Sequence, residues 1–195
     1  MTILSKIKST KLVGILLILT ALQGCAAVAV VAITTGASMA TDRRSIGNQI
    51  DDQSIQVEAY NEISKNKTLS SNTNLHLTSV NGSVLIVGQA PSVNFRDQAI
   101  KIIHEIDGVV RVHNQIRIGT PSSVTTQTND IWLTSKVKTA LFSSKKVNGK
   151  NVKVITENGE VFLMGLVSKN EAEAAVNVTR NISGVNKVFK AFEYL

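Results

Sequence analysis

Apolar and polar residues follow the same order twice along the chain. The segment VNGSVLIVG at residues 80–88 recurs as ENGEVFLMG at residues 157–165, and each copy later reaches a Gly-Val-x-x-Val motif, at Gly108 and at Gly184. Equivalent glycines of the two copies lie 77, 77 and 76 residues apart. Such regular spacing indicates an internal repeat, in which both copies form the same structural unit.

A β-hairpin is predicted in each copy. Asn-Gly at residues 81–82 and 158–159 separates runs of alternating apolar residues. Both central residues of a type I′ turn need the positive φ that Asn and Gly tolerate, so these dipeptides favour tight hairpin turns. The two hairpins are expected to join residues 75–79 with 83–87 and residues 152–156 with 160–164.

Helices are predicted on either side of each hairpin. Apolar residues recur at helical spacing in residues 94–107 and 169–183, and Gly108 and Gly184 follow as C-cap residues. The remaining elements are helices at residues 52–65 and 130–143 and third strands at residues 110–118 and 186–194. Each copy therefore predicts an α+β unit of order α-β-β-α-β, with a small mixed sheet covered on one face by two helices.

Polar residues at the start of the first helix of each copy suit the N-terminus of a helix. Asn129 and Asp130 precede the apolar pattern of residues 130–143, and either is a suitable N-cap. In the first copy, Asp51 and Asp52 are adjacent acids at the start of the expected helix. We interpret them as first-turn residues that complement the helix dipole.

The domain organisation follows from the repeat. A Ser/Thr-rich stretch at residues 119–128 separates the copies and is predicted to be a linker. The first domain is then expected at residues 51–118 and the second at residues 129–195, and residues 128–195 should fold without the first domain. Residues 25–50 form the expected N-terminal tether.

The N-terminus carries a secretory signal. Lysines precede an apolar stretch at residues 12–22, and Leu22-Gln23-Gly24-Cys25 follows. This segment resembles a bacterial lipobox, which implies cleavage after residue 24 and acylation of Cys25. Several acyl chains anchor a protein firmly, because each buried methylene contributes about 0.8 kcal/mol. In that class Ala26, rather than an aspartate, after the cysteine implies the outer membrane.

Two alternatives for this segment stay open. Residues 12–33 are nearly continuously apolar and long enough to span a bilayer, so an uncleaved signal anchor is one of them. An ordinary buried thiol is the other. Cys25 is the only cysteine in the chain, so an intramolecular disulfide is excluded.

Charge excludes one class of partner. Three of the 21 lysines and arginines lie in the signal and all 14 acids follow it, which gives the mature chain a net charge of +4. No dense Lys/Arg run occurs, and we therefore expect no nucleic-acid binding.

Motifs for catalysis are also absent from the sequence. No GxGxxG, GxxxxGK[ST], GxSxG or CxxC occurs, and His104-Glu105 lacks the second histidine of HExxH. We expect no enzymatic activity, no catalytic residues, no metal and no cofactor.

The paired hairpin glycines and the Gly-Val-x-x-Val motifs resemble the BON-domain family of periplasmic proteins. The resemblance extends to TDRRSIGNQIDD at residues 41–52, NDIW at residues 129–132 and ENGEVFLMGLV at residues 157–167. It implies tandem BON domains on a lipid-anchored, periplasm-facing outer-membrane protein. It also implies a non-enzymatic role in envelope integrity at division sites and binding of anionic phospholipid, with phosphatidylglycerol favoured.

The helix at residues 130–143 has two apolar faces. Leu133, Val137, Ala140 and Leu141 form a core-facing stripe at 100° per residue. Ile131 and Phe142 lie on the opposite side with Trp132 beside them, a pattern typical of an interfacial binder. The predicted lipid-binding residues on this face are Ile131, Trp132, Ser135, Lys136, Lys138, Thr139 and Phe142.

The first copy serves as an internal control. It keeps the core stripe at Ile55, Ala59 and Ile63 but has polar Gln53, Ser54 and Ser64 where the second copy has Ile131, Trp132 and Phe142. This contrast favours a functional surface in the second domain. In one alternative Trp132 and Phe142 pack against the first domain or the linker. In another the surface docks outer-membrane assembly or cell-wall remodelling proteins, so that the protein is an interaction adaptor.

Overall fold

A computed structural model describes residues 42–195. The predicted signal peptide at residues 1–24, the lipidation site Cys25 and most of the tether lie outside these residues. No helix within residues 42–195 combines the length and apolar character that crossing a bilayer requires.

The described chain contains two copies of the predicted unit. The first comprises α3 (Ile46–Lys65), α4 (Lys67–Asn72), β1 (Asn74–Val80), β2 (Ser83–Ala90), α5 (Val93–His104) and β3 (Arg111–Ile118). The second comprises α6 (Val124–Ser143), the 3-10 turn η2 (Gly149–Asn151), β4 (Lys153–Glu157), β5 (Glu160–Val167), α7 (Lys169–Arg180) and β6 (Lys187–Tyr194). The predicted α-β-β-α-β order is confirmed in both copies, and only the short α4 and η2 are additions.

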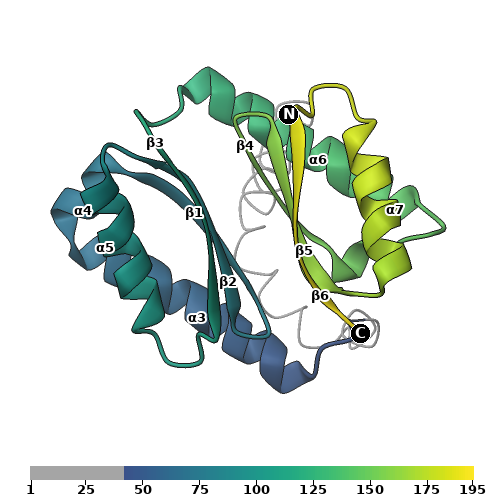
Figure 1. Ribbon diagram of the computed structural model, residues 1–195, viewed down its shortest axis with the longest axis horizontal. Coiled ribbons are helices and arrows are strands. Elements are labelled where there is room, and N and C mark those ends of the chain that lie inside the picture. The colour runs from purple at the N-terminus through teal and green to yellow at the C-terminus, as the bar shows by residue number, and fades with distance from the viewer. Residues whose placement is uncertain (1–41) are drawn as a thin grey trace, which may run out of the picture. The chain divides into compact units, whose positions relative to one another are not determined.

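Both sheets are mixed, as predicted. The order is β1-β2-β3 in the first and β4-β5-β6 in the second, with an antiparallel hairpin and a parallel third strand in each. All four turn residues have positive φ, at Asn81, Gly82, Asn158 and Gly159, which confirms the predicted hairpin turns. Helices α3 and α5 cover one face of the first sheet, and α6 and α7 cover one face of the second (Figure 1).

The first helix of each unit begins earlier than predicted. Helix α3 starts at Ile46 after the N-cap Ser45, and α6 starts at Val124 after the N-cap Ser123. The Oγ atom of Ser123 accepts a hydrogen bond from the backbone N–H of Thr126 (3.1 Å), which satisfies a first-turn donor. The prediction of Asn129 or Asp130 as N-cap was therefore wrong, and helix replaces the second half of the expected linker.

A buried aspartate in each first helix holds the hairpin turn. The carboxylate of Asp130 accepts hydrogen bonds from the backbone N–H groups of Asn158 (2.7 Å) and Gly159 (2.9 Å). Asp52 accepts the equivalent bonds from Asn81 (2.9 Å) and Gly82 (3.0 Å). Asp52 is therefore a buried turn ligand in the helix interior, and its interpretation as a first-turn residue was wrong.

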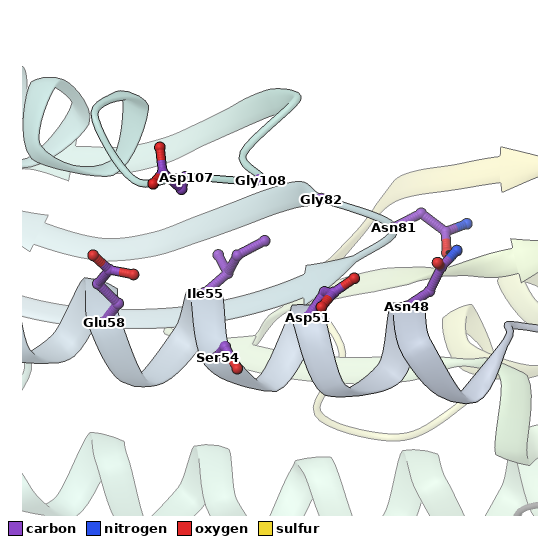
Figure 2. A pocket seen from close by; sticks show the side chains of 9 residues that line it. All are labelled: Asn48, Asp51, Ser54, Ile55, Glu58, Asn81, Gly82, Asp107 and Gly108. Carbon is purple, nitrogen blue, oxygen red and sulfur yellow. Dashed lines mark hydrogen bonds between the residues drawn. The ribbon is translucent and has the colours of Figure 1, made fainter.

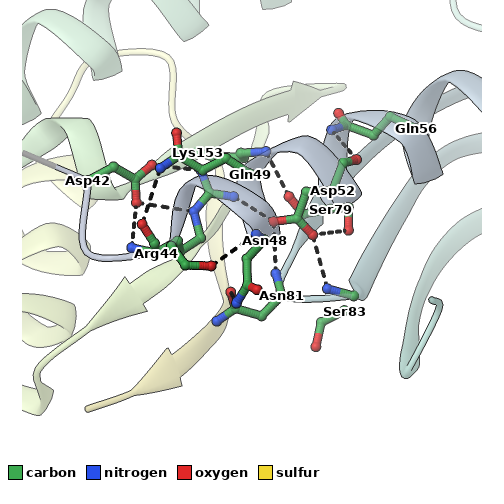
Figure 3. Close-up of polar contacts among 12 residues, drawn as sticks. Asp42, Arg44, Asn48, Gln49, Asp52, Gln56, Ser79, Asn81, Ser83 and Lys153 are labelled. Carbon is green, nitrogen blue, oxygen red and sulfur yellow. Dashed lines mark hydrogen bonds and ion pairs between the residues drawn. The ribbon is translucent and has the colours of Figure 1, made fainter. Parts of the chain in front are cut away.

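Asp52 has two further partners, which Figure 3 shows. Its carboxylate accepts from Ser79 Oγ (2.7 Å) and from Arg44 Nη1 (2.6 Å), and the Arg44 guanidinium also bonds to Asp42. Lys153 of the second unit donates to the Ser79 carbonyl (2.7 Å), and burial lowers the pKa of its ammonium. This network joins the first residues of the described chain to both units.

A third apolar cluster lies between the two sheets. It contains Val80, Leu85 and Val87 of the first unit with Phe162 and Met164 of the second, all at most 2% exposed. The Phe162 and Phe189 rings stack at 4.8 Å beside it. Each sheet therefore buries its helix-free face against the other unit. Residues 42–195 thus contain three apolar clusters, one within each unit and one between the two sheets.

This shared cluster alters the expectation for the second domain alone. A fragment of residues 128–195 should unfold at a lower urea concentration than residues 36–195. It would lack the first turn of α6 and expose Phe162 and Met164, and each such side chain contributes about 1.5–3 kcal/mol when buried. Urea unfolding of both fragments tests this, and equal midpoints would show that the second domain needs no contact with the first.

Candidate lipid-binding surface

The core side of α6 fixes which residues face outward. Leu133, Val137 and Leu141 are at most 5% exposed and pack in the core of the second unit, whereas Ala140 of the predicted stripe is only partly buried. The bonds from Asp130 to the β4–β5 turn add a second attachment near the start of the helix. These contacts set the rotation of α6 about its axis.

The opposite face exposes large apolar side chains. Ile131 is 70% exposed, Trp132 64% and Phe142 58%. The alternative in which Trp132 and Phe142 pack against the first domain or the linker is therefore wrong. Three large exposed apolar side chains on one helix face form a patch of the kind that marks an interaction site.

Two polar residues on this face bond within the helix. Ser135 Oγ donates to the Ile131 carbonyl (3.0 Å), and Thr139 Oγ1 donates to the Ser135 carbonyl (2.9 Å). Their hydroxyl protons are therefore engaged. These two small residues are exposed between the large apolar side chains.

The two predicted lysines differ in their surroundings. The ammonium of Lys136 lies 3.8 Å from the centroid of the Trp132 ring and donates to the Ser183 carbonyl (2.6 Å). This places a fixed positive charge beside the indole, where a cation–π contact holds both groups. Lys138 is exposed, and its ammonium forms no hydrogen bond or ion pair with another residue of the described segment.

The residues considered for catalysis do not assemble. His104 and Glu105 lie at the exposed end of α5, where Glu105 is 3.9 Å from Lys101. Within residues 42–195, no three His, Cys, Asp or Glu side chains gather closely enough to hold a metal ion.

A model of the BON domain matches residues 51–120 and 129–195. The chain belongs to the BON-domain family. It is 38% identical over 174 residues to "Outer membrane lipoprotein DolP" of Haemophilus influenzae, covering 89% of this chain and 90% of that protein. It is also 38% identical over 154 residues to the "21 kDa hemolysin" of Actinobacillus pleuropneumoniae, covering 79% of both chains.

A third relative is more distant in sequence. "Osmotically-inducible protein Y" of Escherichia coli is 24% identical over 158 residues, covering 80% of this chain and 78% of that protein. The similarity to DolP extends over most of the chain. The protein is therefore a DolP-like outer-membrane lipoprotein with two BON domains.

The early start of α6 adds a residue to the surface of the second BON domain. Val124 is 79% exposed and precedes Phe142 by 18 residues. Since 18 residues make about five helical turns, Val124 and Phe142 lie on the same side of α6, about 27 Å apart. The Ser/Thr-rich composition hid this turn, and Ser123 as an N-cap was the signal that could have revealed it.

Positive charge concentrates in the second BON domain. Residues 129–195 contain ten lysines and arginines and six acids, whereas residues 51–118 contain six and seven. The exposed Lys145 and Lys146 follow directly after α6 and were not among the predicted site residues. The net charges of +4 and −1 favour contact of an anionic surface with the second BON domain.

The first helix of the first BON domain also exposes apolar side chains. Gln53, Ser54 and Ser64 are exposed on α3, but Ile46, Ile50 and Val57 are 57%, 60% and 50% exposed on the same helix. Both first helices thus present apolar residues outward. The two helices differ in the residues that accompany these apolar side chains. Helix α6 has aromatic side chains and lysines, whereas α3 has the acids Asp51 and Glu58.

Proposed function

We propose that the second BON domain binds anionic phospholipid through the outer face of α6, with phosphatidylglycerol as the favoured headgroup. The observation that carries the proposal is the exposure of Ile131, Trp132 and Phe142 on one helix face that lysines border. Such a helix lies in the plane of the membrane interface with its apolar side chains inserted.

The energies of the two contributions are comparable. Burial of a large apolar side chain contributes about 1.5–3 kcal/mol, and each lysine near an anionic surface about 1 kcal/mol. Lys138, Lys145 and Lys146 are the exposed cations closest in sequence to the apolar residues. Binding therefore needs both the apolar residues and the charge, which makes it selective for anionic membranes.

Acylation of Cys25 would hold the protein at the periplasmic face of the outer membrane. A tethered domain meets the lipid surface at a high effective concentration, so a weak contact of α6 is enough for binding. Lipid composition then determines where the anchored protein accumulates. We propose that this recognition directs the protein to division sites, where it supports envelope integrity.

Vesicle binding by residues 36–195 tests the proposal, because Trp132 is the only tryptophan. We expect its fluorescence to shift to the blue with phosphatidylglycerol vesicles and to shift less with phosphatidylcholine vesicles. Lys138→Glu should weaken binding several-fold, whereas Lys67→Glu, an exposed lysine of α4, should not. Equal responses to both lipids, or none, would instead favour a protein partner for this surface.

A further inference from the structure

The first BON domain contains a hollow that the proposed lipid site does not use. It has a volume of about 490 Å³ and lies between α3 and the turn before β3 (Figure 2). Asp51 and Glu58 of α3 line it together with Asp107 of the turn, and Ile55 and Gly108 contribute its apolar lining. Figure 2 shows Glu58 and Ile55 pointing from α3 toward the turn.

The three carboxylates of this hollow have no partners within the described residues. Asp51, Glu58 and Asp107 are exposed, and none of their carboxylates forms a hydrogen bond or ion pair with another residue of the segment 42–195. The neighbouring Asp52, by contrast, accepts four hydrogen bonds. Like charges that share one concave site repel one another, so a cation that enters it is attracted by all three.

The second BON domain shows what such a site accommodates. Lys136 occupies the position equivalent to Glu58, and Ser183 and Gly184 occupy those of Asp107 and Gly108. The Lys136 ammonium donates to the Ser183 carbonyl (2.6 Å) and lies 3.8 Å from where a Cβ of Gly184 would be. The second domain thus fills the equivalent place with its own ammonium group.

The two turns share one close contact with the first helix. A Cβ built on Gly108 would lie 3.4 Å from Ile55 Cδ1, and one built on Gly184 would lie 3.7 Å from Leu133 Cδ1. Each turn glycine therefore packs over the equivalent core residue of the first helix. Two side chains at this place differ in charge between the domains, because Lys136 replaces Glu58 and the neutral Ser183 replaces Asp107.

We infer that the hollow of the first BON domain binds a lysine or arginine side chain of a partner protein, in the place that Lys136 fills in the second. The partner is a basic segment that also carries apolar residues. Ile50 and Val57, which are 60% and 50% exposed, lie on α3 beside the carboxylates and can receive those apolar residues. The same carboxylates repel an anionic membrane, so this surface and the α6 surface serve different ligands.

A peptide titration tests the site directly. We expect a 12-residue amphipathic Leu/Lys peptide to shift the amide NMR signals of Gly82 and Gly108 in residues 36–195, and the matching Leu/Glu peptide to leave them unchanged. Glu58→Lys copies the second domain and should weaken binding at least tenfold without lowering the thermal midpoint. Glu105→Lys makes the same charge change outside the hollow and should bind like the wild type. Equal affinity for Glu58→Lys and the wild type, or shifts confined to other residues, would overturn the inference.

Photo-crosslinking of the full chain in cells tests the partner. A photoreactive amino acid at Val57 should crosslink to protein segments that contain lysine or arginine. These crosslinks should disappear with Glu58→Lys and persist with Glu105→Lys and with Trp132→Ala, which removes the proposed lipid contact. Crosslinks to lipid alone, to segments without basic residues, or to no protein would each refute a basic partner at this surface.

Discussion

Asp52→Ala should lower the free energy of unfolding by about 3–5 kcal/mol, as expected when one partner of a buried ion pair is removed. Asp52 is 1% exposed, and its carboxylate accepts hydrogen bonds from Arg44, Ser79, Asn81 and Gly82. The substitution leaves the two turn N–H groups and a guanidinium without their acceptor. Urea unfolding of residues 36–195 measures the loss.

Its neighbour provides a matched control. Asp51 lies on the same helix but is exposed and has no partner among the described residues, so Asp51→Ala should change stability by no more than about 0.5 kcal/mol. Asp52→Asn retains one acceptor oxygen and should fall between the two. If Asp52→Ala cost as little as Asp51→Ala, the Asn-Gly turn would be held by its own backbone and the carboxylate would be dispensable.

The fold was largely predictable because its signals are local. Asn-Gly turns, alternating apolar runs and helical spacing each act over a few residues, and the repeat showed each of them twice. The start of α6 was missed because Ser and Thr are poor interior helix formers, so residues 124–129 resembled a linker. In that stretch, Ser123 as an N-cap residue is the one sequence signal that indicates a helix rather than coil. The start of α3 was missed because Gly47 and Asn48 are poor helix formers as well.

The contacts between distant segments could not be predicted in the same way. Asp52 and Asp130 bond to turns that lie 28 to 30 residues further along the chain, and no local pattern indicates that pairing. A long-range signal was nevertheless present, because Asp52 precedes the asparagine of its Asn-Gly turn by 29 residues and Asp130 precedes its own by 28. The packing of the two sheets had a signal as well. The continuous apolar run Val84, Leu85, Ile86 and Val87 is typical of a strand that is buried on both faces.

The candidate lipid surface was partly predictable. Helical spacing alone separated the buried Leu133 from the exposed Ile131 and Phe142, because packing on one side determines both faces. The position of the Lys136 ammonium was not predictable, since its acceptor is the carbonyl of Ser183 in a distant turn. The Lys136–Ser183 contact bears on both proposed surfaces. In the second BON domain it lies beside Trp132, and in the first BON domain the equivalent place is the open hollow.

Adjacent substitutions on α6 should separate stability from lipid binding. Leu133 is 5% exposed, and Leu133→Ala should cost about 2–5 kcal/mol of folding stability through lost burial and a cavity. Trp132 is 64% exposed, and Trp132→Ala should change stability by about 1 kcal/mol or less. Binding to phosphatidylglycerol vesicles should follow the opposite order, with a strong loss for Trp132→Ala and little for Leu133→Ala while it remains folded.

Phe142→Ser provides an independent test of the same face, since Phe142 lies ten residues from Trp132 and is also exposed. It should weaken vesicle binding and leave thermal stability nearly unchanged, whereas Ser64→Ala, at the equivalent position of α3, should affect neither. Vesicle sedimentation measures binding without relying on the tryptophan signal. The lipid assignment on α6 would be wrong if Trp132→Ala destabilised the fold as much as Leu133→Ala and left vesicle binding intact, because the indole would then contribute to folding and not to the membrane contact.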